Sequence, residues 1–230
     1  MRIAVRAIVL LVLSAAPFAH AEETLASVQE RVSKAWNTVR ALRADVTIMS
    51  EMPTEAESVL TSGKGLLEYH SDGDVGRYRQ TMTITLPPPI EDEAKLEVLF
   101  DGKSLYLVNE VMGQIAAEKH AQADISSGVM PPGGAPLIAV LQERLEMKVL
   151  EEASVDGKMC FVLEGKPKEP LPLERVVIYI DKRTGMQLKA EFYEGGAKPG
   201  STVSYTNVRM NPQLSAERFV YSGPPAVEVE

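Results

Sequence analysis

Residues 77–86 read Arg-Tyr-Arg-Gln-Thr-Met-Thr-Ile-Thr-Leu, and this stretch decides the fold class. Its apolar side chains, Tyr78, Met82, Ile84 and Leu86, alternate with arginines and threonines. A period of two places the apolar residues on one face and the polar residues on the other. This pattern is typical of a strand in an antiparallel sheet that is buried on one side only.

The same alternation returns around residues 44–49, 95–100 and 186–193. Pairs that favour tight turns separate the runs, at residues 72–73, 101–102, 156–157, 184–185 and 195–196. Roughly ten to eleven strands fit between these turn signals. The chain lacks the regular strand–helix–strand order of a parallel nucleotide-binding sheet, so we expect the sheet to be antiparallel.

Two segments follow a helical period instead. Residues 24–42 carry apolar residues three and four positions apart, and Thr24 is suited to cap the helix. A second helix is predicted after the loop at residues 130–134, with Pro136 in its first turn and an apolar stripe to about Met147. Both helices need an apolar surface to cover. We therefore predict a single, strongly curved antiparallel sheet, an unclosed half-barrel, with the helices on its concave face.

The first 21 residues have the three parts of a secretory signal peptide. Arg2 and Arg6 precede an apolar run over residues 8–16, and Ala19-His20-Ala21 supplies the small residues of a cleavage site. The apolar run is too short to span a bilayer, which takes about 20 residues. We expect cleavage near Ala21, which leaves one exported, soluble domain over residues 22–230.

The net charge and the cysteine content exclude further kinds of function and structure. The formal net charge is −8, and without the two arginines of the leader the rest of the chain carries −10. Such an acidic protein is not expected to bind nucleic acid. The single cysteine, Cys160, rules out an internal disulfide, and its strand-like surroundings suggest a buried thiol.

Motifs for catalysis or metal binding are not found. His70 and His120 stand fifty residues apart without nearby cysteines, so no metal site is predicted. Nucleophile-elbow and phosphate-loop motifs are also missing, and we expect neither a cofactor nor enzymatic activity. Nine methionines remain after the leader. They either fill an ordinary core or line an adaptable apolar surface, and composition alone leaves both readings open.

Several stretches resemble the LolA-type family of periplasmic outer-membrane lipoprotein carriers and lipoprotein-sorting proteins. Residues 100–109, Phe-Asp-Gly-Lys-Ser-Leu-Tyr-Leu-Val-Asn, are similar to that family's strand–Asp-Gly-Lys–strand hairpin. Residues 135–141, Ala-Pro-Leu-Ile-Ala-Val-Leu, resemble its central helix, which begins with a proline. The order of segments at 177–181, 184–185, 203–208, 211–212 and 219–229 follows the family's C-terminal part.

The resemblance implies a soluble periplasmic carrier, acting as a monomer, that shields the acyl chains of lipoproteins in a hydrophobic cavity. Such a carrier moves its cargo from an inner-membrane release complex to an outer-membrane acceptor. Leaving one chain of roughly 15 methylenes in water costs about 12 kcal/mol, so covering it is a strong driving force. The alternative is a periplasmic lipid carrier, or a regulator of the same fold that senses lipoproteins.

We expect the acyl-chain cavity to be lined by apolar residues of the strands and of the second helix: Tyr78, Met82, Ile84, Val98, Tyr106, Leu137, Leu141, Ile178 and Ile180. One family feature is missing. Family members carry an Arg-Pro pair before the aromatic strand, where the arginine holds the helical lid closed. Here that region contains Arg77 and Arg79 without the proline, and neither arginine is assigned that role.

Overall fold

The computed structural model describes residues 23–53, 58–73, 75–88, 92–120 and 132–229. The predicted signal peptide lies outside these residues. One mixed sheet of twelve strands contains every named strand, in the order β12-β6-β5-β4-β3-β2-β1-β11-β10-β9-β8-β7. The strands are β1 (Ala41–Pro53), β2 (Ser58–Asp72), β3 (Val75–Thr85), β4 (Glu93–Phe100), β5 (Leu105–Val111), β6 (Gln114–His120), β7 (Leu145–Val155), β8 (Lys158–Pro167), β9 (Arg175–Asp181), β10 (Gln187–Tyr193), β11 (Ser201–Met210) and β12 (Val227–Val229).

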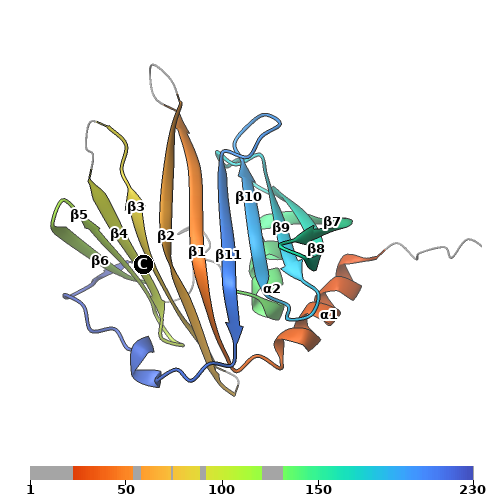
Figure 1. Cartoon of the computed structure of the whole chain (residues 1–230), viewed down its shortest axis with the longest axis horizontal. Helices are drawn as coiled ribbons and strands as arrows, with labels where there is room; N and C mark the ends of the chain where they lie inside the picture. Colours follow the sequence, from red (N-terminus) through yellow and green to blue (C-terminus); the bar gives the residue numbers. More distant parts are fainter. Residues whose placement is uncertain (1–22, 54–57, 74, 89–91, 121–131, 230) are drawn as a thin grey trace, which may run out of the picture.

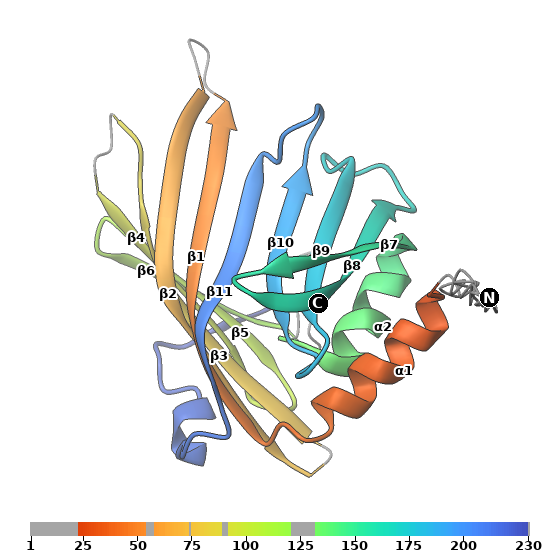
Figure 2. The ribbon, with the colours of Figure 1, turned by 45° about the vertical axis from the view of Figure 1, so that its right-hand side comes forward.

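The predicted half-barrel is confirmed. All neighbouring strands pair antiparallel except β12, which runs parallel to β6. The sheet bends strongly but does not close (Figures 1 and 2). Each of the five turn signals falls in a connection between paired strands. The three residues of β12 are too few to show a period of two.

The first predicted helix is shorter in the structure. α1 (Leu25–Trp36) begins after Thr24, whose hydroxyl accepts a hydrogen bond from Ser27 N at 3.2 Å, as expected of the cap. The apolar stripe continues to Leu42, but the helix ends six residues earlier. Leu42 pairs instead with Tyr69 of β2 and Met210 of β11. Strand pairing on both sides thus extends a segment whose spacing alone would allow a further helical turn.

The second helix, α2 (Gly134–Arg144), lies beside α1 at one end of the sheet (Figure 2). Its fully buried Leu137, Ile138 and Leu141 meet Val28 and Val32 of α1. Beneath the helices lie buried apolar residues of the neighbouring strands: Phe161 and Leu163 of β8, Val176, Ile178 and Ile180 of β9, and Ala190 of β10. The two helices therefore cover the β7–β10 side of the concave face, whereas β1–β6 extend beyond them.

The C-terminal segment crosses the opposite, convex face. The short helix η2 (Ala216–Phe219) contacts β3, and Phe219 is only 1% exposed. Arg218 donates two hydrogen bonds to Oε2 of the buried Glu68, at 3.0 and 2.8 Å. Tyr221 stacks on Tyr106 with the ring centroids 4.3 Å apart. These contacts lead the chain across to β12, which pairs with the edge strand β6.

Candidate functional site

An apolar trough follows the concave face where the helices do not reach. The register pairs Tyr78 with Phe100, Met82 with Leu96, and Val98 with Leu107, so these side chains share one face of β3, β4 and β5. Ile84 continues the face on β3, and Ile48 continues it on β1 through its pairing with Gly63. Tyr78 and Met82 are buried, but the others are only half-buried. We call the surface formed by the following eight residues the trough: Ile48, Tyr78, Met82, Ile84, Leu96, Val98, Phe100 and Leu107.

Two glycines of β2 form the bare floor between Ile48 and Ile84. A Cβ on Gly63 would lie 2.9 Å from Ile84 Cγ1 and 3.2 Å from Met82 Cε. A Cβ on Gly65 would lie 1.8 Å from the carbonyl oxygen of Thr81. The β3 backbone therefore occupies the space that a side chain at position 65 would need. This close approach lets the sheet bend sharply between β2 and β3, which gives the trough its curvature.

A cavity of about 470 Å³ lies at one end of the trough, between the helices and the sheet. Four aromatic side chains line it, in a chain where aromatic residues make up only 6%. Trp36 and Tyr69 have ring centroids 5.0 Å apart, and those of Tyr78 and Phe100 are 5.6 Å apart. Pro136 and Val140 of α2 contribute to the opposite wall. Tyr78 and Phe100 belong to both the cavity and the trough, so the two apolar surfaces are continuous.

The ends of the helices near the cavity are held by close backbone contacts. Gly134 N donates to Gly185 O at 3.0 Å, which ties the start of α2 to the β9–β10 turn. A Cβ on Gly134 would lie 2.3 Å from the ring of Trp36, so the indole packs directly on the α2 backbone. The end of α1, the start of α2 and this turn therefore form one packed unit above the cavity.

The hydroxyl group of Tyr78 is unusual among the cavity residues. The residue is 4% exposed, and its hydroxyl oxygen has no hydrogen-bond partner within the part of the chain that the structure describes. Burial raises the pKa of this hydroxyl well above its ordinary value, and the nearby Tyr205 raises that pKa further. The hydroxyl is thus a neutral donor in an apolar place, and leaving it unpaired there costs free energy.

The nine residues expected from the sequence fall into three places. Tyr78, Met82, Ile84 and Val98 lie together in the trough. Leu137, Leu141, Ile178 and Ile180 are at most 1% exposed and form the packed core between the helices and β9. Tyr106 lies on the convex face, stacked on Tyr221.

Sequence reasoning missed the other three aromatic residues of the cavity, Trp36, Tyr69 and Phe100. Each lies on a different element, α1, β2 or β4. The apolar periodicity marks Trp36 and Phe100 as inward-facing. It carries no information on which inward-facing residues meet one another or border a cavity.

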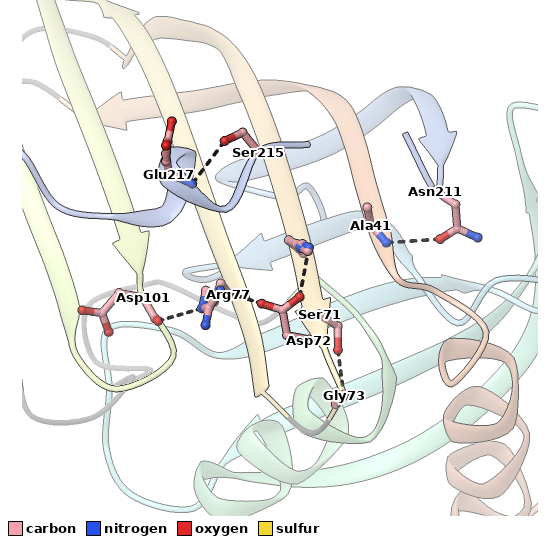
Figure 3. A network of polar contacts seen from close by, with 10 residues as sticks. Ala41, Ser71, Asp72, Gly73, Arg77, Asp101, Asn211, Ser215 and Glu217 are labelled. Carbon is pink, nitrogen blue, oxygen red and sulfur yellow. Dashed lines mark hydrogen bonds and ion pairs between the residues drawn. The ribbon is translucent and has the colours of Figure 1, made fainter. Parts of the chain in front are cut away.

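Neither arginine near the β2–β3 turn points toward the helices. Arg77 Nη1 contacts Asp72 Oδ2 at 2.8 Å, and its Nε donates to Asp101 O at 3.2 Å (Figure 3). Arg79 pairs with Glu97 at 2.9 Å, on the convex face. Arg77 therefore joins the β2–β3 and β4–β5 turns beside the cavity, and the helices are held by the glycine contacts described above.

Cys160 is fully buried, as the sequence suggested. Burial raises the pKa of its thiol to about 11, and the Asp181 carboxylate contributes in the same direction. The thiolate is the reactive form of the side chain, so its fraction at pH 8 is about 100-fold lower than that of an ordinary thiol.

We expect Ellman's reagent to label Cys160 in the folded protein about 100-fold more slowly, or slower still, than in protein unfolded in 6 M guanidinium. Fast labelling of the folded protein would contradict the buried environment of this thiol.

Within the described residues, no group of three or more His, Cys, Asp or Glu side chains is arranged to hold a metal ion. The helices that the structure describes include none long and apolar enough to cross a membrane.

No protein-family model matches the chain. An uncharacterized protein of Methanocaldococcus jannaschii is 26% identical over 132 residues, which span 57% of this chain and 37% of that protein. The matched region thus covers little more than a third of that relative's length.

Among solved structures, MucB matches with a TM-score of 0.53 and 13% identity, over 88% of this chain and 64% of MucB. A LolA superfamily protein from Nitrosomonas europaea matches with a TM-score of 0.37 and 17% identity, over 87% of this chain and 99% of that protein. The likeness to MucB is one of fold. The fold that the sequence resemblance implies, an open, curved sheet with helices on its concave face, is confirmed.

Proposed function

We propose that this protein is an exported, non-catalytic carrier that shields the acyl chains of lipoproteins between the inner and outer membranes. The observation that carries the proposal is the continuous apolar surface formed by the trough and the cavity. The helices cover only part of it, so trough residues that are otherwise suited to a core stay half-buried. The cavity volume of about 470 Å³ falls within the range of roughly 300–1,000 Å³ that is typical of ligand sites.

The energetics favour an apolar guest that can leave again. Each methylene removed from water contributes about 0.8 kcal/mol, so a few buried methylenes already give useful affinity. Part of the trough stays open to solvent, which limits the total and keeps binding reversible. Met82 lies at the centre of the trough, where its flexible thioether can adapt to chains of different shape.

The identity of the guest separates the proposed role from its alternatives. We would purify the protein from the periplasm of a host that exports it and record native mass spectra of the purified protein. A bound species with the mass of an acylated protein supports the lipoprotein carrier, and depletion should then leave lipoproteins in the inner membrane. Bound free lipid supports a lipid carrier instead. Protein that carries neither, and takes up neither when offered, contradicts both.

A charge in the trough should weaken acyl-chain binding. Val98→Asp places a carboxylate between Gln80 and Leu107, against the path of the chain. Desolvating that charge costs several kcal/mol, so we expect affinity for a fluorescent fatty-acyl probe to fall at least about tenfold.

The matched control is Thr83→Asp, which adds the same charge to the convex face of the neighbouring strand. It should bind the probe as the unchanged protein does. Thermal unfolding of both variants shows whether the fold is kept. Equal binding by a folded Val98→Asp variant would place the guest elsewhere.

A further inference from the structure

We propose that the outer edge of β6 is a docking site for an extended segment of a partner protein, one that alternates acidic and apolar residues and adds to the sheet in place of β12. The inference goes beyond the carrier role, because this edge lies outside the trough and the cavity. It starts from a difference between the two edges of the sheet.

The edge at β7 is protected against further pairing. Its register with β8 shifts between Leu150 and Ala153, which interrupts the regular ladder of this strand. Four charged residues of β7 are exposed: Glu146, Lys148, Glu151 and Glu152. Bulges and charges on an edge strand hinder the addition of another strand.

The edge at β6 lacks this protection over most of its length. Its seven residues pair with β5 without a shift in register. Residues 114–117, Gln-Ile-Ala-Ala, carry no charge, and among the described strands none pairs with them on the outer side. Ile115 is 56% exposed, and Met112 in the adjoining turn is 70% exposed. A regular, uncharged edge with exposed apolar side chains is suited to the addition of a strand.

β12 shows what kind of segment this edge accepts. Its sequence is Val-Glu-Val, and Glu228 Oε1 lies 2.9 Å from Lys119 Nζ of β6. The three residues of β12 are exposed and pair only with residues 118–120, in the parallel direction, which is slightly less stable per residue than antiparallel pairing. A partner segment as long as β6 would make more backbone hydrogen bonds than β12 does and can still place an acidic side chain beside Lys119.

The rest of the C-terminal segment can stay in place when β12 leaves. Phe219 and Arg218 hold η2 on the convex face, and Tyr221 stacks on Tyr106. Exchange of one strand for another at this edge therefore requires no movement of the helices or of the trough.

The first test uses the full chain and the fluorescein-labelled peptide Val-Glu-Val-Glu-Val-Glu-Val as the probe. Glu228→Lys sets two lysines side by side and so loosens β12, and the side chain of Glu228 is 79% exposed, so the fold is kept. Because β12 no longer competes for the edge, we expect this variant to bind the probe at least about fivefold more tightly than the unchanged protein, as measured by fluorescence anisotropy. Glu217→Lys is the matched control, since it makes the same change of charge on the same segment outside β12, and its affinity should stay within twofold of the unchanged protein.

The second test reverses the charge on β6. Lys119→Glu should bind the peptide Val-Lys-Val-Lys-Val-Lys-Val more tightly than the acidic probe, because the partner's charge must now complement a carboxylate. Lys148→Glu places the same change on the opposite edge strand, β7, and should keep the preference of the unchanged protein.

Hydrogen exchange locates the bound probe. In Glu228→Lys with the acidic probe bound, amides of β6 should exchange more slowly, whereas those of β7 should not change. Slower exchange at β7 alone, or a gain in affinity no larger than that of Glu217→Lys, would overturn the inference. Both results are independent of acyl-chain binding in the trough, so the carrier role is tested separately.

Discussion

Gly65→Ala should lower the free energy of unfolding by about 4 kcal/mol, near the upper end of what single substitutions cause. The added Cβ would lie 1.8 Å from Thr81 O and 2.9 Å from the Met82 Cα, and both are backbone atoms of a paired strand. No side-chain rotation relieves such a clash. The β2–β3 pair would have to separate or flatten, and the trough depends on its curvature. Urea unfolding followed by circular dichroism measures the loss.

The matched control for this prediction is Gly200→Ala. A Cβ there would have no contact closer than 3.7 Å, to the flexible side chain of Glu194. We expect a change within about 0.5 kcal/mol, as for ordinary surface substitutions. Should the two variants unfold at the same urea concentration, the close approach of β2 and β3 is not a requirement of the fold. If Gly65→Ala fails to accumulate as soluble protein while Gly200→Ala does, the prediction is met in its strongest form.

Phe219→Ala should release the C-terminal segment from the convex face at a cost of about 3 kcal/mol. Phe219 is the buried residue of this segment, and its ring lies 6.0 Å from that of His70. Beyond it, Val220–Pro224 bridge a second cavity of about 350 Å³ and are packed less tightly on the sheet. Loss of the ring leaves the contacts of Arg218 and the short β12 pairing to hold the segment.

Hydrogen exchange is the suitable measurement, because the effect is local. Amides of β12 and of its partner β6 should exchange faster in Phe219→Ala, whereas those of β9 and β10 should not change. Val220→Ala alters the next residue, which is 63% exposed, and should leave all these rates as they are. Uniform acceleration across the sheet would mean that Phe219 supports the whole fold rather than the segment.

The two halves of the concave face have different roles in this structure. Leu137, Leu141, Ile178 and Ile180 are fully covered and hold the helices on β8–β10. Ile84, Val98 and Leu107 continue the same face but are only half covered. A complete helical cover would turn the second half into ordinary core, so the limited reach of the two helices is what leaves the proposed binding surface uncovered.

The sequence by itself determined the class of fold. A period of two in residues 77–86 and in the other runs, separated by Asp-Gly and similar turns, required antiparallel strands with one apolar face. A period of three to four at residues 24–42, and from residue 137 to about Met147, indicated two helices on that face, which end in the structure at Trp36 and Arg144. These features are local, because backbone geometry sets how side chains repeat along a helix or strand.

Only the tertiary structure decided which apolar residues are core and which form the site. Ile178 and Val98 are both apolar residues of strands, yet one lies under the helices and the other in the trough. The gathering of Trp36, Tyr69, Tyr78 and Phe100 at the cavity depends on contacts between distant segments. Periodicity tells which way a side chain points, whereas its neighbours follow from strand order, register and the placement of the helices.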